Sequence, residues 1–318
     1  MNVSALTALL EPLNLRSCLV QQHGSLIFEH YRDVRVSSEV AKINSCTKSI
    51  LSALICIAID KGILPEPATP VSEFYPQLGQ DKDVRKQEIT IAHLLTMTAG
   101  FNWTEFGGRN SFPKMTRSPN WVEYVLEQPM ADHPGARMEY NSGISQLLSA
   151  MLVQASGMTT ARFAELYLFR PLGIKQYLWE TDPQGIHTGG FGLQLQPADL
   201  LKFGQLYLQQ GVWEKEQLIT REWIARSVQP FIHAEAPRHG GYGWHWWTDS
   251  YSVPLGNKEP AAVEYFYARG YAGQFVYVLP ILQTVVVLTQ DNKRGKNNPP
   301  VDVFRDYIAP LLVVPSEH

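Results

Sequence analysis

The chain has 318 residues, enough for about two domains of typical length. Hydrophobic residues make up 45% of the sequence and charged residues 18%, a composition that excludes a disordered, collagenous or coiled-coil chain. With 27 basic against 30 acidic residues the formal net charge is −3 and basic residues form no block, so neither nucleic acid nor an acidic membrane surface is an expected partner.

The first 64 residues predict a hairpin and then a buried helix. Two short β-rich runs between residues 18 and 31 surround His23-Gly24, as in a hairpin. A helix is expected from Asn44, as N-cap, to a stop at Gly62. Its residues from Ile50 to Ile59 are apolar nearly all round, which is typical of a buried helix.

The rest of the chain is helical first and then returns to strands. Between residues 65 and 228, helices are predicted over Ile91–Thr98, Ile144–Gln154, Thr160–Phe169 and Pro197–Gln209. Further on, the patterns predict strands at Tyr242–Trp247, Phe275–Leu279 and Thr284–Thr289, and a last helical run around Val301–Leu312. Strands near both ends with helices between them indicate one sheet built from both ends of the chain, beside a helical insertion.

Several features suggest a cytoplasmic protein. The longest apolar run, Ala53–Ile59, has seven residues, whereas a membrane span needs about 20. The first residues lack the basic region and the small-residue cleavage site of an export signal. Cys18, Cys46 and Cys56 are odd in number and lack metal-ligand spacing, which fits a reducing compartment. The histidines also lack metal spacing, and we expect neither a metal nor a cofactor.

A Ser-x-x-Lys motif occurs twice, at Ser45–Lys48 and at Ser111–Lys114. With 19 serines and 12 lysines, about 0.7 matches are expected by chance, so the motif alone decides nothing. Serine and lysine share a face only on a helix. Ser45 opens the buried helix, whereas Pro113 predicts that Ser111 lies in a loop. The first copy is therefore the candidate for a nucleophilic serine with an activating lysine.

A purely structural alternative stays open for Ser45 and Lys48. Ser45 could cap the helix while Lys48 extends to solvent. Two further elements bear on the choice. Tyr140-Asn141-Ser142 stands just before a predicted helix, where a phenol can act as a base beside an ammonium. Ala268-Arg269-Gly270 precedes a predicted strand, where a glycine permits close backbone approach and an N–H could serve an oxyanion.

These elements together resemble a known superfamily. The order of Ser45-x-x-Lys48, Tyr140-x-Ser142 and Ala268-Arg269-Gly270 resembles the serine β-lactamases and penicillin-binding proteins. Within them the chain looks like the class C-type branch, with the family VIII esterases and nylon-oligomer hydrolases. Supporting segments in family order are Ile91–Phe101, Pro171–Ile174, Gly189–Leu193 and Tyr242–Trp244.

The resemblance implies a fold and domain boundaries. The fold is α/β (α+β), with an antiparallel sheet flanked by helices and an inserted all-helical domain, as in the β-lactamases and transpeptidases. Residues 1–64 plus 229–318 would form the sheet domain and residues 65–228 the helical domain, with the active site at their interface.

The resemblance also implies roles for individual residues. Ser45 would be acylated, with Lys48 as its activator and Tyr140 as the general base. Ser142 would support Lys48, and the backbone N–H groups of Ser45 and Tyr271, next to Gly270, would form the oxyanion hole. Substrate contacts are expected from Trp244, Arg269 and Phe191.

Two departures from the family pattern bear on the substrate. Ser142 stands where many relatives carry asparagine, and Arg269 stands at the middle position of the Lys-Thr-Gly motif, whose lysine is absent. Efficient lactamase activity is therefore not expected. Arg269 could replace the charge of that lysine, although strand alternation would place its side chain on the opposite face of the sheet.

A serine hydrolase acting on small esters or amides is the resulting hypothesis. Esters are favoured because the sequence reveals no additional acid to protonate an amine leaving group. The alternatives are a peptidase specific for D-amino acids, a penicillin-binding protein, a weak β-lactamase, or a non-catalytic sensor that is acylated once. The sequence leaves the oligomeric state open, with a dimer as one alternative.

Overall fold

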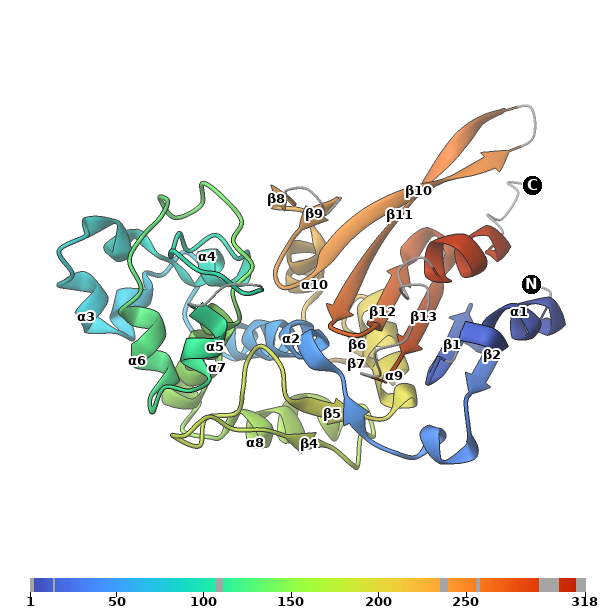
Figure 1. Ribbon diagram of the computed structural model, residues 1–318, viewed down its shortest axis with the longest axis horizontal. Coiled ribbons are helices and arrows are strands. Elements are labelled where there is room, and N and C mark those ends of the chain that lie inside the picture. The colour runs from blue at the N-terminus through green and yellow to red at the C-terminus, as the bar shows by residue number, and fades with distance from the viewer. Residues whose placement is uncertain are drawn as a thin grey trace.

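An eight-stranded antiparallel sheet forms one side of the molecule (Figure 1). In spatial order its strands are β2 (Ser25–Tyr31), β1 (Ser17–Gln22), β13 (Thr284–Thr289), β12 (Gln274–Leu279), β11 (Lys258–Gly270), β10 (Trp247–Leu255), β9 (Gly241–Tyr242) and β8 (Ile232–His233). The order joins both ends of the chain in one sheet. This computed structural model describes residues 3–13, 15–106, 111–234, 240–255, 258–291 and 303–312, with the backbone alone for residues 3–5, 253–255 and 258–261.

The predicted N-terminal hairpin is confirmed. β1 pairs with β2 on one side and with β13 on the other, where Leu19 lies opposite Val287. His23 and Gly24 form the turn with φ angles of 48° and 77°. This left-handed pair of residues matches the twist of the strands it connects.

The C-terminal strands are confirmed in part. β12 and β13 lie where the pattern predicts them, and both are buried along their full length. The predicted strand Tyr242–Trp247 is wrong, because the chain turns between β9 and β10. His245 adopts a φ of 58° there, and its N–H donates to the Leu95 carbonyl outside the sheet.

The predicted buried helix is confirmed as α2 (Thr47–Asp60), which lies between the sheet and a helical region (Figure 1). All residues from Thr47 to Ile59 are buried. The helix starts later than predicted, since Asn44–Cys46 form a 3-10 turn ahead of it. Gly62 follows its end with a φ of 66°.

The helical region lies on the other side of α2 from most of the sheet (Figure 1). Its helices are α3 (Pro76–Gly79), α4 (Ile91–Leu95), α5 (Ser111–Met115), α6 (Trp121–Leu126), α7 (Ser142–Ser156) and α8 (Thr160–Ala164). In contrast, α9 (Pro197–Leu208) packs on β12 and β13, and α10 (Arg221–Val228) packs on α2.

Several helix boundaries differ from the predicted ones. α4 ends at Leu95 because Met97 adopts a φ of 61°, which a helix interior does not allow. The run from Thr160 divides into α8 and a π-helical turn, Glu165–Phe169. Ser111 begins α5 and is not in a loop, because Pro113 falls in the first turn, where its missing N–H costs no hydrogen bond.

Shorter elements complete the fold. They are α1 (Val3–Leu10), the 3-10 turns Glu11–Leu13, Val34–Ser37, Val71–Glu73, Val84–Glu88, Pro280–Leu282 and Ala309–Leu311, the π-helical turn Phe304–Ile308, and strands β3 (Ala41–Lys42), β4 (Leu178–Trp179), β5 (Leu193–Leu195), β6 (Val212–Trp213) and β7 (Glu216–Gln217). The last predicted helical run is thus two short turns, and residues 301–302 lie outside the described part. α1 and the Phe304–Ile308 turn lie side by side (Figure 1).

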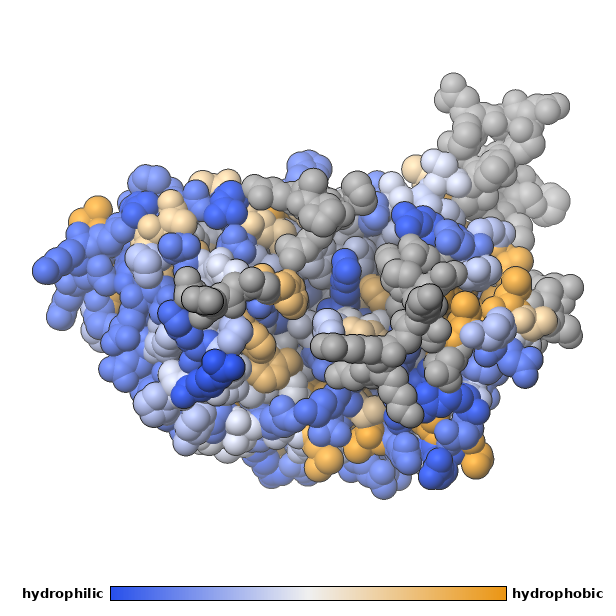
Figure 2. Space-filling view, viewed as in Figure 1, coloured by the Kyte–Doolittle hydropathy of each residue, from blue (hydrophilic) through white to orange (hydrophobic). Residues whose placement is uncertain are grey.

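The hydropathy of the visible surface is that of an ordinary globular protein, as the composition of the sequence predicts. Figure 2 shows a largely hydrophilic face with small groups of hydrophobic residues. Within the described residues, every helix is too short or too polar to cross a membrane. The α+β fold class is confirmed, while the domain boundaries at residues 64 and 228 stay a prediction.

Candidate active site

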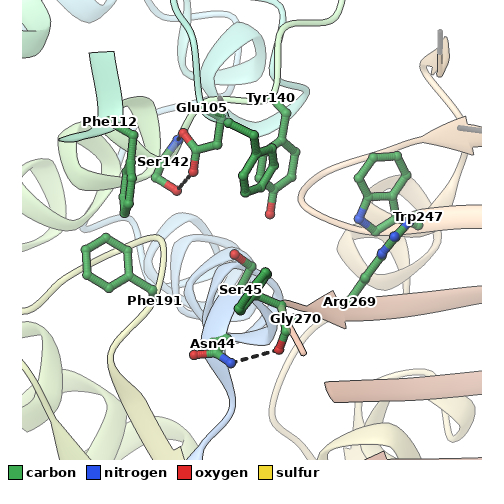
Figure 3. A pocket seen from close by; sticks show the side chains of 12 residues that line it. Asn44, Ser45, Glu105, Phe112, Tyr140, Ser142, Phe191, Trp247, Arg269 and Gly270 are labelled. Atoms are coloured by element: carbon green, nitrogen blue, oxygen red, sulfur yellow. Dashed lines mark hydrogen bonds between the residues drawn. The ribbon is translucent and has the colours of Figure 1, made fainter. Parts of the chain in front are cut away.

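A cavity of about 520 Å³ opens where the starts of α2 and α7 meet the end of β11 (Figure 3). Its lining comes from both ends and the middle of the chain: Asn44, Ser45, Glu105, Phe106, Phe112, Tyr140, Ser142, Phe191, Trp247, Arg269, Gly270 and Tyr271. Seven of the nine predicted site residues therefore line the cavity, and an eighth, Lys48, lies one helical turn behind Ser45.

Lys48 is buried, with 1% of its surface exposed, and three oxygen atoms surround its amine. Its Nζ lies 2.8 Å from Ser142 Oγ and 2.8 Å from the Gly190 carbonyl oxygen. Ser45 Oγ is the third partner, at 3.3 Å. The ammonium also stands 4.7 Å from the centroid of the Tyr140 ring. The alternative in which Lys48 extends to solvent is therefore wrong.

Gly190 leaves the space that this lysine occupies. A Cβ at position 190 would lie 3.1 Å from Lys48 Nζ and 3.0 Å from Ser142 Oγ. These separations are shorter than ordinary van der Waals contacts, so a side chain there would require Lys48 or Ser142 to shift by a few tenths of an ångström. Glycine at this position leaves both groups where they are.

Ser45 lies in the 3-10 turn and does not cap α2. The position before the helix, Cys46, makes no side-chain capping bond, and Thr47 Oγ1 donates locally to the Asn44 carbonyl at 2.7 Å. The prediction of Asn44 as the N-cap of this helix is also wrong. It adopts a φ of 50°, and its Nδ2 donates to the Tyr271 carbonyl oxygen at 2.8 Å. Its side chain therefore ties the serine turn to the end of β11.

A second contact joins the same two segments. A Cβ at Gly270 would overlap the carbonyl oxygen of Ile43, so only glycine lets β11 approach the serine turn this closely. The Tyr271 side chain is 70% exposed, which leaves its backbone as the part of the residue directed to the fold. The two segments that carry the expected oxyanion-hole N–H groups, of Ser45 and Tyr271, are thus in direct contact.

Tyr140 is clamped between two aromatic rings. Phe106 stacks on one face with a centroid distance of 6.2 Å, and Trp247 on the other with 5.9 Å. In Figure 3 its hydroxyl points into the cavity toward Ser45. The next residue, Asn141, fixes the start of α7, because its Oδ1 accepts from the N–H groups of Gly143 and Ile144.

A buried carboxylate that the sequence did not reveal completes the polar part of the site. Glu105 is 8% exposed and lines the cavity. Its Oε2 accepts from Trp103 Nε1 at 2.7 Å and from the Ser142 N–H at 3.0 Å, and its Oε1 accepts from the Ser142 hydroxyl. The site thus contains an acidic residue that the sequence did not reveal, and its oxygens act as hydrogen-bond acceptors. Glu105 stands in no motif, and its distance from Tyr140 along the chain carries no periodic signal.

The remaining walls of the cavity are aromatic. Phe191 lines it as predicted and meets Phe112 edge-on at 5.4 Å. The predicted contact from Trp244 is wrong: this ring is buried against Trp223, at 5.6 Å, outside the cavity. The turn between β9 and β10 directs Trp247 to the site in its place.

Arg269 lines one edge of the cavity, contrary to the expectation from strand alternation. It lies near the end of β11, opposite Phe275, and its exposed side chain extends alongside Trp247 (Figure 3). The length of the arginine side chain and its place at the end of the strand let the guanidinium reach the site.

His245 is a buried histidine behind the site that sequence reasoning also missed. Its Nδ1 lies 2.9 Å from the Leu95 carbonyl oxygen and its Nε2 lies 3.0 Å from Ser145 Oγ, while its own carbonyl accepts from Ser49 Oγ at 2.7 Å. Burial, together with the charge of Lys48, lowers the pKa of His245 to about 3. The neutral ring therefore joins α4 and α7, while the backbone carbonyl of the same residue contacts α2.

Among the described residues, the cysteines and His93 lie outside the cavity lining. All three cysteines are buried and free, and burial raises the pKa of the Cys46 thiol beside the candidate nucleophile. Over the described ranges, no group of three His, Cys, Asp or Glu side chains could hold a metal ion. His93 serves structure, because it forms a capping box with Thr90 at the start of α4.

A buried lysine between a serine and a second hydroxyl, with a tyrosine over it, is an arrangement in which an amine can activate a hydroxyl nucleophile. The Beta-lactamase family model matches residues 17–306, and the chain belongs to this family of serine hydrolases. The resemblance inferred from the motifs is thereby confirmed.

Individual relatives are distant. The D-alanyl-D-alanine-carboxypeptidase/endopeptidase AmpH of Escherichia coli (strain K12) is 23% identical over 223 residues, which cover 61% of this chain and 57% of AmpH. The chain thus matches little more than half the length of this curated relative.

Two solved structures cover nearly the whole chain. A provisionally assigned 6-aminohexanoate-dimer hydrolase from Bacillus anthracis matches with a TM-score of 0.78 and 19% identity, over 96% of this chain and 81% of that one. EstCE1, a hydrolase with promiscuous acyltransferase activity, matches with a TM-score of 0.75 and 17% identity, over 96% and 97%. At such identities the likeness establishes the fold alone.

Proposed function

We propose that this protein hydrolyses small esters or amides through an acyl intermediate on Ser45. The observation that carries the proposal is the environment of Lys48, whose Nζ contacts two oxygens at 2.8 Å and faces Ser45 Oγ at 3.3 Å. A buried amine fixed on two sides has one direction left for proton exchange, and that direction leads to the nucleophile.

Acylation follows from this arrangement. Ser45 Oγ attacks the carbonyl carbon of the substrate while its proton passes to the Lys48 and Tyr140 pair. The N–H groups of Ser45 and Tyr271 stabilise the oxyanion, a contribution of about 10²–10³ in rate for one donor. Tyr140 protonates the leaving group. In the second half, water takes the place of the leaving group and the same residues accept its proton.

The cavity supports a small substrate with an apolar acyl group. Its volume of about 520 Å³ falls within the range of small-molecule sites. Phe112 and Phe191 form one wall and Trp247 another, so the acyl chain would contact aromatic rings on both sides. Arg269 at the edge of the cavity would favour substrates that carry an anionic group near the leaving group.

A peptidase acting on D-amino-acid ends is the second candidate. The relationship to AmpH favours it, as does the guanidinium of Arg269, which could bind a terminal carboxylate. Release of D-alanine from an acyl-D-Ala-D-Ala peptide, at a kcat/KM above that of esters, would favour this candidate over the first.

Turnover of p-nitrophenyl esters of increasing acyl length tests the proposal. We expect measurable kcat/KM for the wild-type protein and a loss to the uncatalysed rate in Ser45→Ala. Ser52→Ala is the matched control, since this α2 hydroxyl is buried and has no hydrogen-bond partner among the described residues. Equal rates in wild type and Ser45→Ala would refute the proposal, and a single acylation without turnover would favour the sensor alternative.

A further inference from the structure

The Glu105 carboxylate makes more contacts than a helix end requires. Its Oε2 accepts from Trp103 Nε1 and from the Ser142 N–H, the first of the N–H groups at the start of α7. These two bonds would suffice to satisfy an anion at a helix N-terminus. The second oxygen, Oε1, instead accepts from the Ser142 hydroxyl.

This extra bond fixes the direction of the next one. A hydroxyl group has one proton to donate, and that of Ser142 is directed to Glu105. Ser142 Oγ can then only accept from Lys48 Nζ, at 2.8 Å. The Gly190 carbonyl, also at 2.8 Å, can likewise only accept. Two of the bonds made by the lysine amine are thereby fixed as donations.

The remaining position on the amine faces Ser45 Oγ, at 3.3 Å. On a tetrahedral nitrogen with two fixed N–H groups, this is where the exchangeable proton or the lone pair must lie. A Ser142 hydroxyl that was free to turn could donate to a neutral Lys48 amine and occupy its lone pair. Glu105 prevents this competing arrangement.

We propose that Glu105 is a positioning residue that acts through Ser142 to keep the proton-exchanging side of Lys48 directed at Ser45. The inference deepens the proposed acyl-Ser45 function and rests on it. A carboxylate in this place also has a structural role at the start of α7, so the test must separate the two roles.

A double-mutant cycle separates them. The four proteins are wild type, Glu105→Gln, Ser142→Ala and the double variant, assayed with a p-nitrophenyl ester, with kcat divided by the amount of Ser45 that a fluorophosphonate labels. Glutamine keeps the shape but donates to Ser142 Oγ from its amide. We expect Glu105→Gln to lower kcat by about 10–100-fold, the range for a hydrogen bond to a charged group, with KM changed by no more than about twofold.

The coupling is the decisive quantity. If Glu105 acts through Ser142, then adding Glu105→Gln to Ser142→Ala lowers kcat by no more than about twofold. An equal fold-loss in both backgrounds overturns the inference. So does an unchanged kcat with a lowered melting temperature, which is the result of a purely structural role.

Controls keep the test decisive. Asp199→Asn removes another buried carboxylate, bonded to Lys202 on α9, and should leave kcat unchanged whatever it does to stability. If Glu105→Gln does not fold, Glu105→Asp replaces it in the same double-mutant cycle. Its shorter side chain moves the carboxylate away from the Ser142 hydroxyl. A wild-type protein that never acylates Ser45 overturns the proposed function, whereas an active wild type without coupling overturns this inference alone.

Discussion

The chemistry of single residues here depends on how Lys48 is enclosed. A buried ammonium is costly unless its N–H groups are satisfied, and this one has two oxygens at 2.8 Å and a third at 3.3 Å. The longest of the three contacts leads to Ser45, so the weakest restraint on the amine is on the side that the proposed reaction would use. Tyr140 lies over the same amine and points to the same serine (Figure 3).

Both partners of the serine are therefore predicted to be essential. Lys48→Ala and Tyr140→Phe should each lower kcat by about 10²–10⁴-fold, the range for a lost general acid or base. The phenylalanine keeps the stacking on Phe106 and Trp247, so Tyr140→Phe should melt near the wild-type temperature.

Ester turnover and thermal melting of both variants measure this. Tyr177→Phe, a half-buried tyrosine outside the cavity, is the matched control for the hydroxyl group and should retain full activity. Near-normal kcat in either active-site variant would show that the proton relay runs through other groups.

The sequence revealed the site only where a motif constrained it. Ser45, Lys48, Tyr140 and Ser142 follow a known order, and the fold brings them together. Glu105 comes from a loop without periodicity or motif, and only the folded chain places its oxygens against Ser142. Their catalytic roles stay predictions until they are measured.

At the scale of elements, His245 joins three helices behind the site. It bonds to Leu95 at the end of α4, to Ser145 on α7 and to Ser49 on α2. His245 lies in the turn within the segment predicted as a strand. Its φ of 58° is incompatible with a strand, so the alternating pattern of the sequence misled the prediction there. The turn places the His245 ring between the helices. The same turn decides that Trp247, and not Trp244, reaches the cavity.

This histidine should make the protein sensitive to acid. Its pKa is about 3 in the folded protein and about 6.5 in an unfolded chain. Between these values the unfolded chain binds more protons, so stability is full above pH 6.5 and falls as the pH drops toward 3, by about 1.4 kcal/mol per pH unit from this group. His245→Asn, which tolerates a positive φ, should remove that part of the pH dependence.

Urea unfolding of both proteins at pH 7.5 and pH 5 measures the difference. Wild type should lose about 2 kcal/mol more than the variant over this interval. His30, His93 and His187, whose pKa values are also lowered by burial, are common to both proteins and cancel in the comparison. Equal losses in the two proteins would show that His245 is not a buried neutral group.

At the scale of the whole molecule, the sheet order explains how distant segments form one site. β1 pairs with β13, and β11 ends against the turn before α2, so the two ends of the chain position Ser45 and Tyr271 together (Figure 1). The helical region supplies Tyr140, Ser142 and Glu105 from the other side. Periodicity predicted most of these elements but not the long β10–β11 hairpin, whose length depends on pairing between segments rather than on local pattern.

The most direct test of the account is whether Ser45 becomes acylated during turnover. Intact-mass spectrometry of the protein mixed with p-nitrophenyl acetate, followed by peptide mapping, should detect one acetyl group on Ser45 that appears with the first release of p-nitrophenolate and disappears when the ester is consumed. An adduct on any other residue, or ester turnover with no adduct on Ser45 at any time, would contradict the account.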